Sequence, residues 1–206
     1  MKNRLVTTLK DQVYEAMFTD IIKGVYSADM ILTEKFFIEK YQVSRAPIRE
    51  ALLQLTSKKF LISIPRQGYR ILQPDKSYMI ELAKFRAVTE PAFLERYFSS
   101  IDTDCLETLR IICDKYAACP DHDFMAHWKY NCEFHLKLFS MYKNPYAYEA
   151  LENALYLQTV YFVQTEHDAT MDLHRAIVDY IEKRDVNTAM KILRADIETL
   201  TTSDSL

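Results

Sequence analysis

The chain has 206 residues, of which 49% are hydrophobic, and its formal net charge is −3. This length fits one large or two small domains, and this composition is sufficient for a packed core. No apolar run reaches the roughly 18 residues that a membrane-spanning helix requires. Residues 1–4 are polar and lead into a polar segment rather than into the apolar core of a secretory signal. These features predict a cytoplasmic protein without a membrane partner.

The use of cysteine and glycine excludes several kinds of site. The four cysteines show no CxxC spacing, so neither a zinc knuckle nor a redox motif is indicated, and reduced thiols are expected. Glycine occurs only twice, at Gly24 and Gly68. The chain therefore has no GxGxxG or P-loop motif, and we expect no nucleotide cofactor.

The charge is unevenly divided along the chain. Residues 1–72 hold 12 Lys+Arg and 7 Asp+Glu, for a net charge of +5, whereas residues 73–206 hold 14 and 22, for a net charge of −8. A basic first third beside an acidic remainder indicates that the amino-terminal part meets a polyanion. Uneven surface charge without any function is the alternative.

Two short helices are predicted at the start of the chain. Apolar residues follow helical spacing over residues 9–23, and Gly24 stands where a carboxy-terminal cap is expected. Thr33 is a favourable N-cap for a second helix that ends near Tyr41. With the turn at residues 42–43 and the helix that follows, they form a helix-turn-helix.

Residues 43–55 predict a helix that presents two arginines at its exposed start. Ser44 is a favourable N-cap, and Pro47 lies in the first turn, where its missing N–H costs nothing. Arg45 and Arg49 lie one turn apart, opposite a predicted apolar stripe of Ile48, Ala51, Leu52 and Leu55. Guanidinium groups in this position can bind guanine O6 and N7 or a phosphate. This is the arrangement of a DNA-recognition helix.

The alternative for this segment is a solvated amphipathic helix with ordinary surface arginines. Two findings would contradict a role in DNA binding. One is burial of Arg45 and Arg49 in the protein interior, and the other is acidic neighbours that neutralise them.

A β-hairpin is predicted directly after this helix. Residues 60–64 and 69–72 are β-prone, and the turn between them contains proline and glycine. A hairpin that follows a recognition helix is the wing of a winged helix-turn-helix. Arg66 and Arg70 are expected to follow phosphates or to enter the minor groove, with ordinary exposed hairpin arginines as the alternative.

The predicted fold class is mainly α, with a winged helix-turn-helix at residues 1–72, a linker at residues 73–76 and an all-α helical bundle at residues 77–206. The linker is polar and contains a proline. The bundle contains no glycine, and helical patterns recur throughout it. The predicted helices cover residues 77–98, 103–118, 121–141, 145–164, 169–183 and 186–201.

In this order, these features resemble the GntR family of bacterial transcription regulators, and in particular the FadR-like subfamily with a helical FCD ligand-binding domain. The resemblance covers nearly the whole chain and rests on residues 13–24, 32–35 and 43–52 and on the wing around Arg66 and Gly68. It implies a ligand-responsive DNA-binding regulator, expected to be a repressor, that binds a near-palindromic double-stranded operator as a homodimer, with residues 1–72 as the DNA-binding domain and residues 77–206 as the effector-binding and dimerisation domain.

The resemblance also implies which residues contact DNA. Arg45 and Arg49 resemble the arginines of the recognition helix that contact bases and phosphates, and Lys35 stands where an arginine is common. Gly68 matches the glycine at the tip of the wing. The full expected set is Lys35, Ser44, Arg45, Ala46, Pro47, Arg49, Arg66 and Gly68.

Residues 85–90 resemble the start of the FCD domain, where an arginine often faces the effector cavity. Arg86 is therefore the candidate anchor for a small-molecule effector. A bidentate arginine favours a carboxylate or a phosphate, and we expect a carboxylate. The alternative is a surface or interhelical arginine that is paired with a nearby acid.

The resemblance further implies a metal site made of Asn131, His135, His174 and Asp196. Asn131 stands where the family has an aspartate, and Asp196 falls where many members have a histidine. A neutral amide is a weak ligand, but two histidines and one carboxylate suit a divalent ion, with zinc expected first and nickel or manganese next. The alternative for each histidine is a hydrogen-bonded packing residue.

Two rival functions remain open from the sequence alone. A metalloenzyme would use His135, His174 and Asp196 as three ligands and leave one position for water, but no general base is evident. We therefore expect no enzymatic activity. The second rival is a DNA-binding dimer whose helical domain takes no effector. The sequence identifies neither the effector nor the operator.

Overall fold

A computed structural model describes residues 8–27, 29–120, 123–164 and 173–202. The chain divides into two compact units, Met1–Gln73 and Pro74–Leu206, which are described separately. The division falls at the start of the predicted linker. Lys76, which the sequence placed in that linker, is the first residue of a helix, because the side chain of Asp75 accepts a hydrogen bond from the backbone N–H of Tyr78 at 2.7 Å and caps it.

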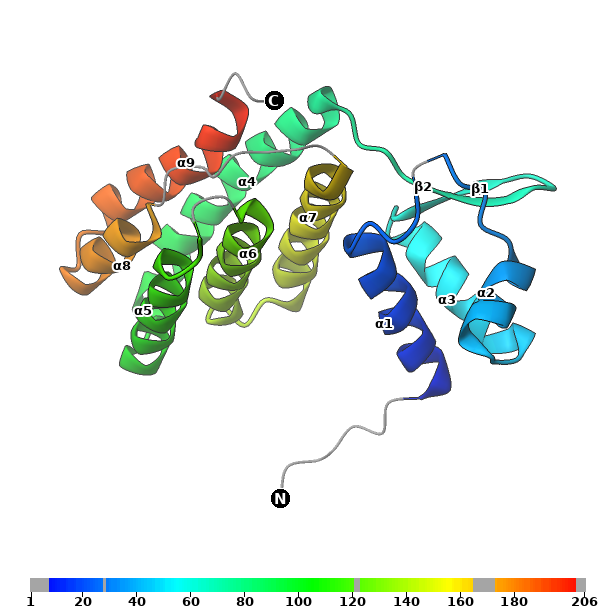
Figure 1. The fold of residues 1–206 in the computed structure, drawn as a ribbon. Helices are drawn as coiled ribbons and strands as arrows, with labels where there is room; N and C mark the ends of the chain where they lie inside the picture. The colour runs from blue at the N-terminus through cyan, green and yellow to red at the C-terminus, as the bar shows by residue number, and fades with distance from the viewer. Residues whose placement is uncertain (1–7, 28, 121–122, 165–172, 203–206) are drawn as a thin grey trace. The chain divides into compact units, whose positions relative to one another are not determined.

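Residues 8–27 and 29–73 of the first unit form three helices followed by a two-stranded hairpin, as predicted (Figure 1). Each apolar residue of the predicted stripe on the third helix is buried, which places the opposite side of that helix at the surface. The elements are α1 (Leu9–Ile22), α2 (Glu34–Tyr41), α3 (Arg45–Ser57), β1 (Leu61–Ile64) and β2 (Gly68–Ile71).

Among the described helices of the first unit, the starts of α1 and α2 follow local capping rules and that of α3 does not. The Thr33 hydroxyl accepts a hydrogen bond from the backbone N–H of Phe36 at 3.1 Å, which fixes the start of α2. Gln42 ends α2 in a left-handed conformation with φ 55°. Ser44 occupies the N-cap position of α3, but among the described residues its side chain makes no capping hydrogen bond. Ser44 is therefore a weaker cap than the sequence suggested.

The hairpin is antiparallel, with Leu61 opposite Ile71 and Ile64 opposite Gly68. Gly68 is the first residue of β2 rather than a residue of the tip, which corrects the position taken from the resemblance. Its φ is 141°, and a Cβ there would lie 2.5 Å from the carbonyl oxygen of Leu32. Glycine is thus required because the hairpin packs closely against the segment before α2. Arg66, with φ 65°, lies in the turn itself.

The described residues of the second unit form only helices and the loops between them, as predicted, and the central helix α4 packs against α9 and α7 (Figure 1). Two starts differ from the prediction: α6 begins after its cap Asp123, and α8 begins at His174, with residues 121–122 and 165–172 outside the described part. No helix in the described ranges is long and apolar enough to cross a membrane. The helices are α4 (Lys76–Tyr97), η1 (Phe98–Ser100), α5 (Thr103–Ala117), α6 (Phe124–Ser140), α7 (Pro145–Gln164), α8 (His174–Glu182) and α9 (Val186–Thr202).

The core of this bundle contains polar and charged side chains among its apolar residues. Arg86 and Glu90 have no exposed surface, although such side chains are almost never fully buried without a partner. His135, Gln158, His174 and Asp196 are also buried. A folded domain retains such groups only where they bond to one another or to a ligand.

Candidate DNA interface and buried polar site

The two predicted DNA-reading arginines lie at the surface at the start of α3. The side chain of Arg45 is 65% exposed and that of Arg49 is 59% exposed. The buried stripe on the other side of α3 holds the helix in place and turns both guanidinium groups outward. Burial in the interior, which would have contradicted a role in DNA binding, does not occur.

One acidic residue, Glu34 at the start of α2, lies against both arginines. Its Oε1 is 2.7 Å from the Nε of Arg49, and its Oε2 is 3.4 Å from the Nε of Arg45. A single carboxylate faces two guanidinium groups, so the three residues together keep one positive charge. The arginines are therefore oriented by Glu34 but not neutralised.

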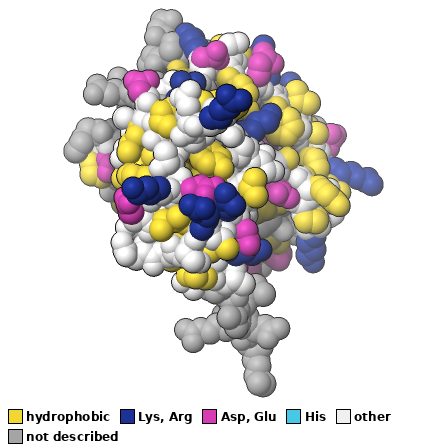
Figure 2. Space-filling model, turned by 90° about the vertical axis from the view of Figure 1, so that its right-hand side faces the viewer, with side chains coloured by type: hydrophobic (Ala, Val, Ile, Leu, Met, Phe, Trp, Pro, Cys, Tyr) yellow, Lys and Arg dark blue, Asp and Glu magenta, His cyan; other side chains and the backbone are white. Residues whose placement is uncertain are grey.

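The other expected DNA contacts lie on the same unit. Lys35 is 84% exposed and forms an ion pair with Glu39 at 3.7 Å. Ser44, Ala46 and Arg66 are exposed. Pro47 and Gly68 are half-buried. In the view of Figure 2, Lys and Arg side chains are interspersed with acidic and hydrophobic ones and do not form one continuous basic patch. Binding to DNA would then depend on a few placed residues more than on net charge.

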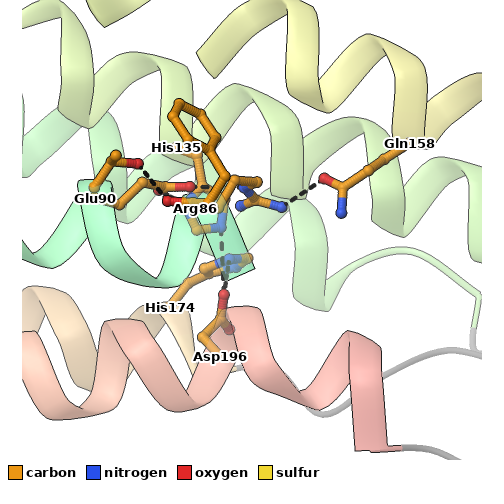
Figure 3. Close-up of polar contacts among 8 residues, drawn as sticks. Arg86, Glu90, His135, Gln158, His174 and Asp196 are labelled. Carbon is orange, nitrogen blue, oxygen red and sulfur yellow. Dashed lines mark hydrogen bonds and ion pairs between the residues drawn. The ribbon is translucent and has the colours of Figure 1, made fainter. Parts of the chain in front are cut away.

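A cluster of buried polar side chains fills the centre of the second unit. Figure 3 shows these side chains pointing toward one another. We call the cluster the buried polar site; its members are Arg86 and Glu90 of α4, His135 of α6, Gln158 of α7, His174 of α8 and Asp196 of α9.

Glu90 links an arginine to a histidine within this site. Its Oε1 is 2.7 Å from the Nε of Arg86, and its Oε2 is 2.6 Å from the Nδ1 of His135. Burial opposes ionisation of Glu90, but the charges of Arg86 and His135 hold its pKa below its ordinary value. An ionised Glu90 accepts the Nδ1 proton of His135. The Nε2 atom of His135 is thereby left as the nitrogen that can bind a ligand.

His135, His174 and Asp196 meet at a point that fits a metal ion. Each offers one ligand atom, and these atoms lie within 4.8 Å of one another. The Oδ2 of Asp196 is 3.3 Å from the Nε2 of His135 and 3.4 Å from the Nε2 of His174. Two ligands about 2.1 Å from a tetrahedral ion are separated by about 3.4 Å, so the spacing matches a zinc-like geometry.

The electrostatics of these three residues also favour a cation. Burial opposes ionisation of Asp196, but the two neighbouring histidines lower its pKa far below the ordinary value. The buried Nε2 of His135 has no hydrogen-bond partner among the described residues. An ionised, buried carboxylate needs a positive charge close by, which a protonated imidazole or a bound divalent ion can supply.

Asn131, the fourth predicted ligand, lies one turn before His135 on α6. Its Nδ2 is buried and has no hydrogen-bond partner in the described part of the chain. Rotation of the amide exchanges Nδ2 and Oδ1, and only the oxygen binds cations. The structure therefore brings three of the four predicted ligands together. Coordination by Asn131 stays a prediction.

Arg86 is paired with a nearby acid, as in the alternative that the sequence left open, but this acid is Glu90 of the same helix, and the interhelical partner is the amide of Gln158. The side chain has no exposed surface, and its Nη1 donates to the Oε1 of Gln158 at 2.9 Å in addition to the contact with Glu90. Its Nη2 and the Nε2 of Gln158 are buried donors without a partner among the described residues. Arg86 is thus held in place by two side chains, and its Nη2 remains without a hydrogen-bond partner among the described residues.

Sequence reasoning missed Glu34, Glu90 and Gln158. Glu34 and Glu90 fall inside segments that carried the resemblance, and Glu90 lies four residues after Arg86, which is the spacing of a helical ion pair. The pairing of Glu90 with Arg86 could therefore have been predicted from this spacing. Gln158 lies in an apolar, aromatic-rich helix, and nothing near it in the sequence points to Arg86, 72 residues earlier.

A winged helix-turn-helix joined to an all-α bundle with a buried polar site defines a class of DNA-binding transcription regulators. Residues 9–71 match the family model of bacterial regulatory proteins of the gntR family. Residues 81–199, more than half of the chain, match the model of the FCD domain. The chain therefore belongs to the GntR family of transcription regulators that carry an FCD domain.

Individual relatives agree with this assignment. The chain is 26% identical over 210 residues to an uncharacterised HTH-type transcriptional regulator of Escherichia coli K12, YieP, covering 88% of this chain and 89% of the relative. The fold of this chain is similar to that of E. coli McbR/YncC, with a TM-score of 0.77 at 18% sequence identity; the match covers 94% of this chain and 97% of McbR/YncC. It is also similar to a putative GntR regulator from Rhodococcus sp. RHA1, with a TM-score of 0.73 at 20% identity over 92% and 93%.

Proposed function

We propose that the protein is a homodimeric transcription repressor that binds a near-palindromic operator and responds to a small carboxylate bound beside a divalent metal ion. The observation that carries the proposal is the pair of exposed arginines at the start of α3. Paired recognition helices enter successive major grooves, and the effector changes their spacing. The role does not require chemistry on a substrate, and we expect no enzymatic activity.

His135, His174 and Asp196 would hold the metal ion. In the family pattern that the sequence resembles, the carboxylate ligand stands at the position of Asn131 and a histidine at that of Asp196. In this chain the carboxylate is Asp196 of α9, whereas α6 has the amide Asn131, so the candidate ligand set still contains one carboxylate. Ligands of this kind suit zinc first and nickel or manganese next. The ion would supply positive charge and a coordination position for the effector.

The effector would be a small carboxylate, held by the donors that are left over near the metal ligands. Arg86 and Gln158 each keep one buried N–H group without a partner among the described residues. An unpaired buried donor costs about 1 to 3 kcal/mol, and an anion that accepts from it recovers this free energy. Carboxylate oxygens accept such bonds well.

Thermal unfolding of metal-stripped protein tests the proposed site. Adding zinc, nickel or manganese chloride at about 100 times its Kd should stabilise the folded protein by about 2.7 kcal/mol, because the ion binds only the native state. His174→Ala should abolish the rise. His127→Ala is the matched control, since His127 is also buried but bonds to the carbonyl of Asp123 outside the cluster. Succinate added after the metal should raise Tm further and change operator affinity in a gel shift.

No metal-dependent rise in the wild-type protein would exclude the metal. A rise that persists in His174→Ala would place it elsewhere. Turnover of a small carboxylate that disappears in His174→Ala would favour a metalloenzyme instead. A rise with metal but no effect of any small carboxylate on operator binding would leave a regulator without this class of effector.

A further inference from the structure

Helix α4 has two faces of different character. One face points into the bundle and carries Arg86 and Glu90 of the buried polar site. On the other face, Phe85 is 42% exposed and Val88 is 63% exposed, and Ala92 is exposed one turn later. Residues three and four apart share one side of a helix, so these three form a single apolar stripe. Within the second unit, none of the described residues covers this stripe.

Charged residues border the stripe in an order that allows self-pairing. Glu81 and Lys84 precede it and form an exposed ion pair with each other at 2.8 Å, which a partner's charges can replace at little cost. Glu95 and Arg96 follow it, and both are exposed. If two copies of α4 pack antiparallel about a two-fold axis between residues 88 and 89, Glu81 of each copy faces Arg96 of the other. Lys84 then lies within two residues of Glu95. A parallel arrangement would place each charge against its own kind.

The apolar residues agree with the same register. With the axis between residues 88 and 89, Phe85 of one copy meets Ala92 of the other, a large side chain against a small one. Val88 lies beside the axis and packs close to its own equivalent. Surfaces at a two-fold axis must be self-complementary in this way.

We propose that the exposed stripe of α4 is the docking site for α4 of a second copy of this chain, packed antiparallel about a two-fold axis. This inference rests on the homodimer of the proposed function and specifies the surface that forms it. Phe85 and Arg86 are neighbours on one rigid helix. A ligand that shifts α4 at the buried polar site therefore moves the dimer contact directly, which is the coupling that a ligand-responsive regulator needs.

Sedimentation velocity of the full chain over a concentration series tests this surface. Val88→Glu places two carboxylates side by side at the axis, and the dimer Kd should rise about 100-fold, since like charges in contact cost several kcal/mol. Val88 is exposed in the single chain, so folding should not change. Ile111→Glu on α5 is the control, because Ile111 is also an exposed large hydrophobic residue, at 48%, and should leave the Kd unchanged.

Charge reversal gives a second measurement that damaged folding cannot imitate. Glu81→Arg and Arg96→Glu should each raise the dimer Kd about tenfold, and the double variant should restore it, because the pair is rebuilt with its signs exchanged. A monomeric wild-type chain at micromolar concentration would overturn both this inference and the proposed homodimer. A wild-type dimer that persists in Val88→Glu and shows no rescue would overturn this surface alone and assign the stripe to another occupant, such as the chain's own amino-terminal unit.

Discussion

Each unit of the protein places a glutamate against an arginine, and the two pairs differ in exposure. Glu34 contacts Arg49 at 2.7 Å where the arginine is 59% exposed, whereas Glu90 contacts Arg86 at 2.7 Å with no exposed surface on either side chain. In water such a contact contributes at most about 1 kcal/mol, so a DNA phosphate can replace the glutamate. In the bundle the charges cannot separate without a large desolvation cost. The same ion pair is thus exchangeable at one site and fixed at the other.

The largest expected effect is a loss of folding stability when the buried ion pair of Arg86 and Glu90 is broken. Arg86→Met leaves Glu90 charged and buried with only His135 as a partner, and it should lower the free energy of unfolding by about 3 to 5 kcal/mol in urea titration. The double variant Arg86→Met with Glu90→Leu should lose less than the sum of the single variants, since no charge is left unpaired. Arg194→Met, at an exposed arginine of α9, should change stability by less than about 0.5 kcal/mol. A small loss in Arg86→Met would mean that water reaches this pair.

An intermediate effect is expected from removing the exchangeable arginines. Arg45→Ala or Arg49→Ala should cost about 1 to 3 kcal/mol of specific operator binding, because the guanidinium group is expected to bind base edges or backbone. Folding stability should change little, since both side chains are more than half exposed. Gel-shift titration on operator and on unrelated DNA measures this. Lys35→Ala is the control and should weaken binding to all sequences alike; unchanged operator affinity in Arg45→Ala would count against the recognition helix.

The smallest effect is expected from Glu34→Gln. Removing its charge reduces repulsion of the phosphates, so non-specific affinity should rise about two- to threefold at low salt and less at high salt. The ratio of operator to non-specific affinity should fall, since the arginines lose the carboxylate that orients them. Glu39→Gln, another acid of α2, controls for the change in net charge. If both variants behave alike, Glu34 contributes charge but no orientation.

Much of the fold could be predicted because it depends on local signals. Helical spacing placed α3 and its buried stripe, and the β-prone stretches around a glycine turn placed the hairpin. Thr33 fixed the start of α2 as a cap. Errors occurred where a local rule had a tertiary competitor. Gly68, expected in the tip, is required instead by the backbone of Leu32, which is distant in sequence.

The candidate site was predictable only in part for the same reason. His135, His174 and Asp196 were found through their resemblance to a family pattern, and the structure brings them together. The partners that set their chemistry come from other helices. Glu90 reaches His135 across 45 residues of sequence, and no local pattern reports such a contact. The sequence predicts that Arg86 faces an effector cavity, but it does not reveal the hydrogen bond from Arg86 to Gln158, which lies 72 residues later.

The close contact between the hairpin and the segment before α2 bears on the affinity for DNA. Leu32 and Tyr69 exchange two backbone hydrogen bonds of 2.8 Å, and the missing side chain at Gly68 lets the strands approach this closely. The wing is therefore immobilised during folding, before any duplex arrives. A preorganised arm gives up little conformational entropy when it meets a groove. The energy of its contacts with DNA then goes into affinity instead of into ordering a loop.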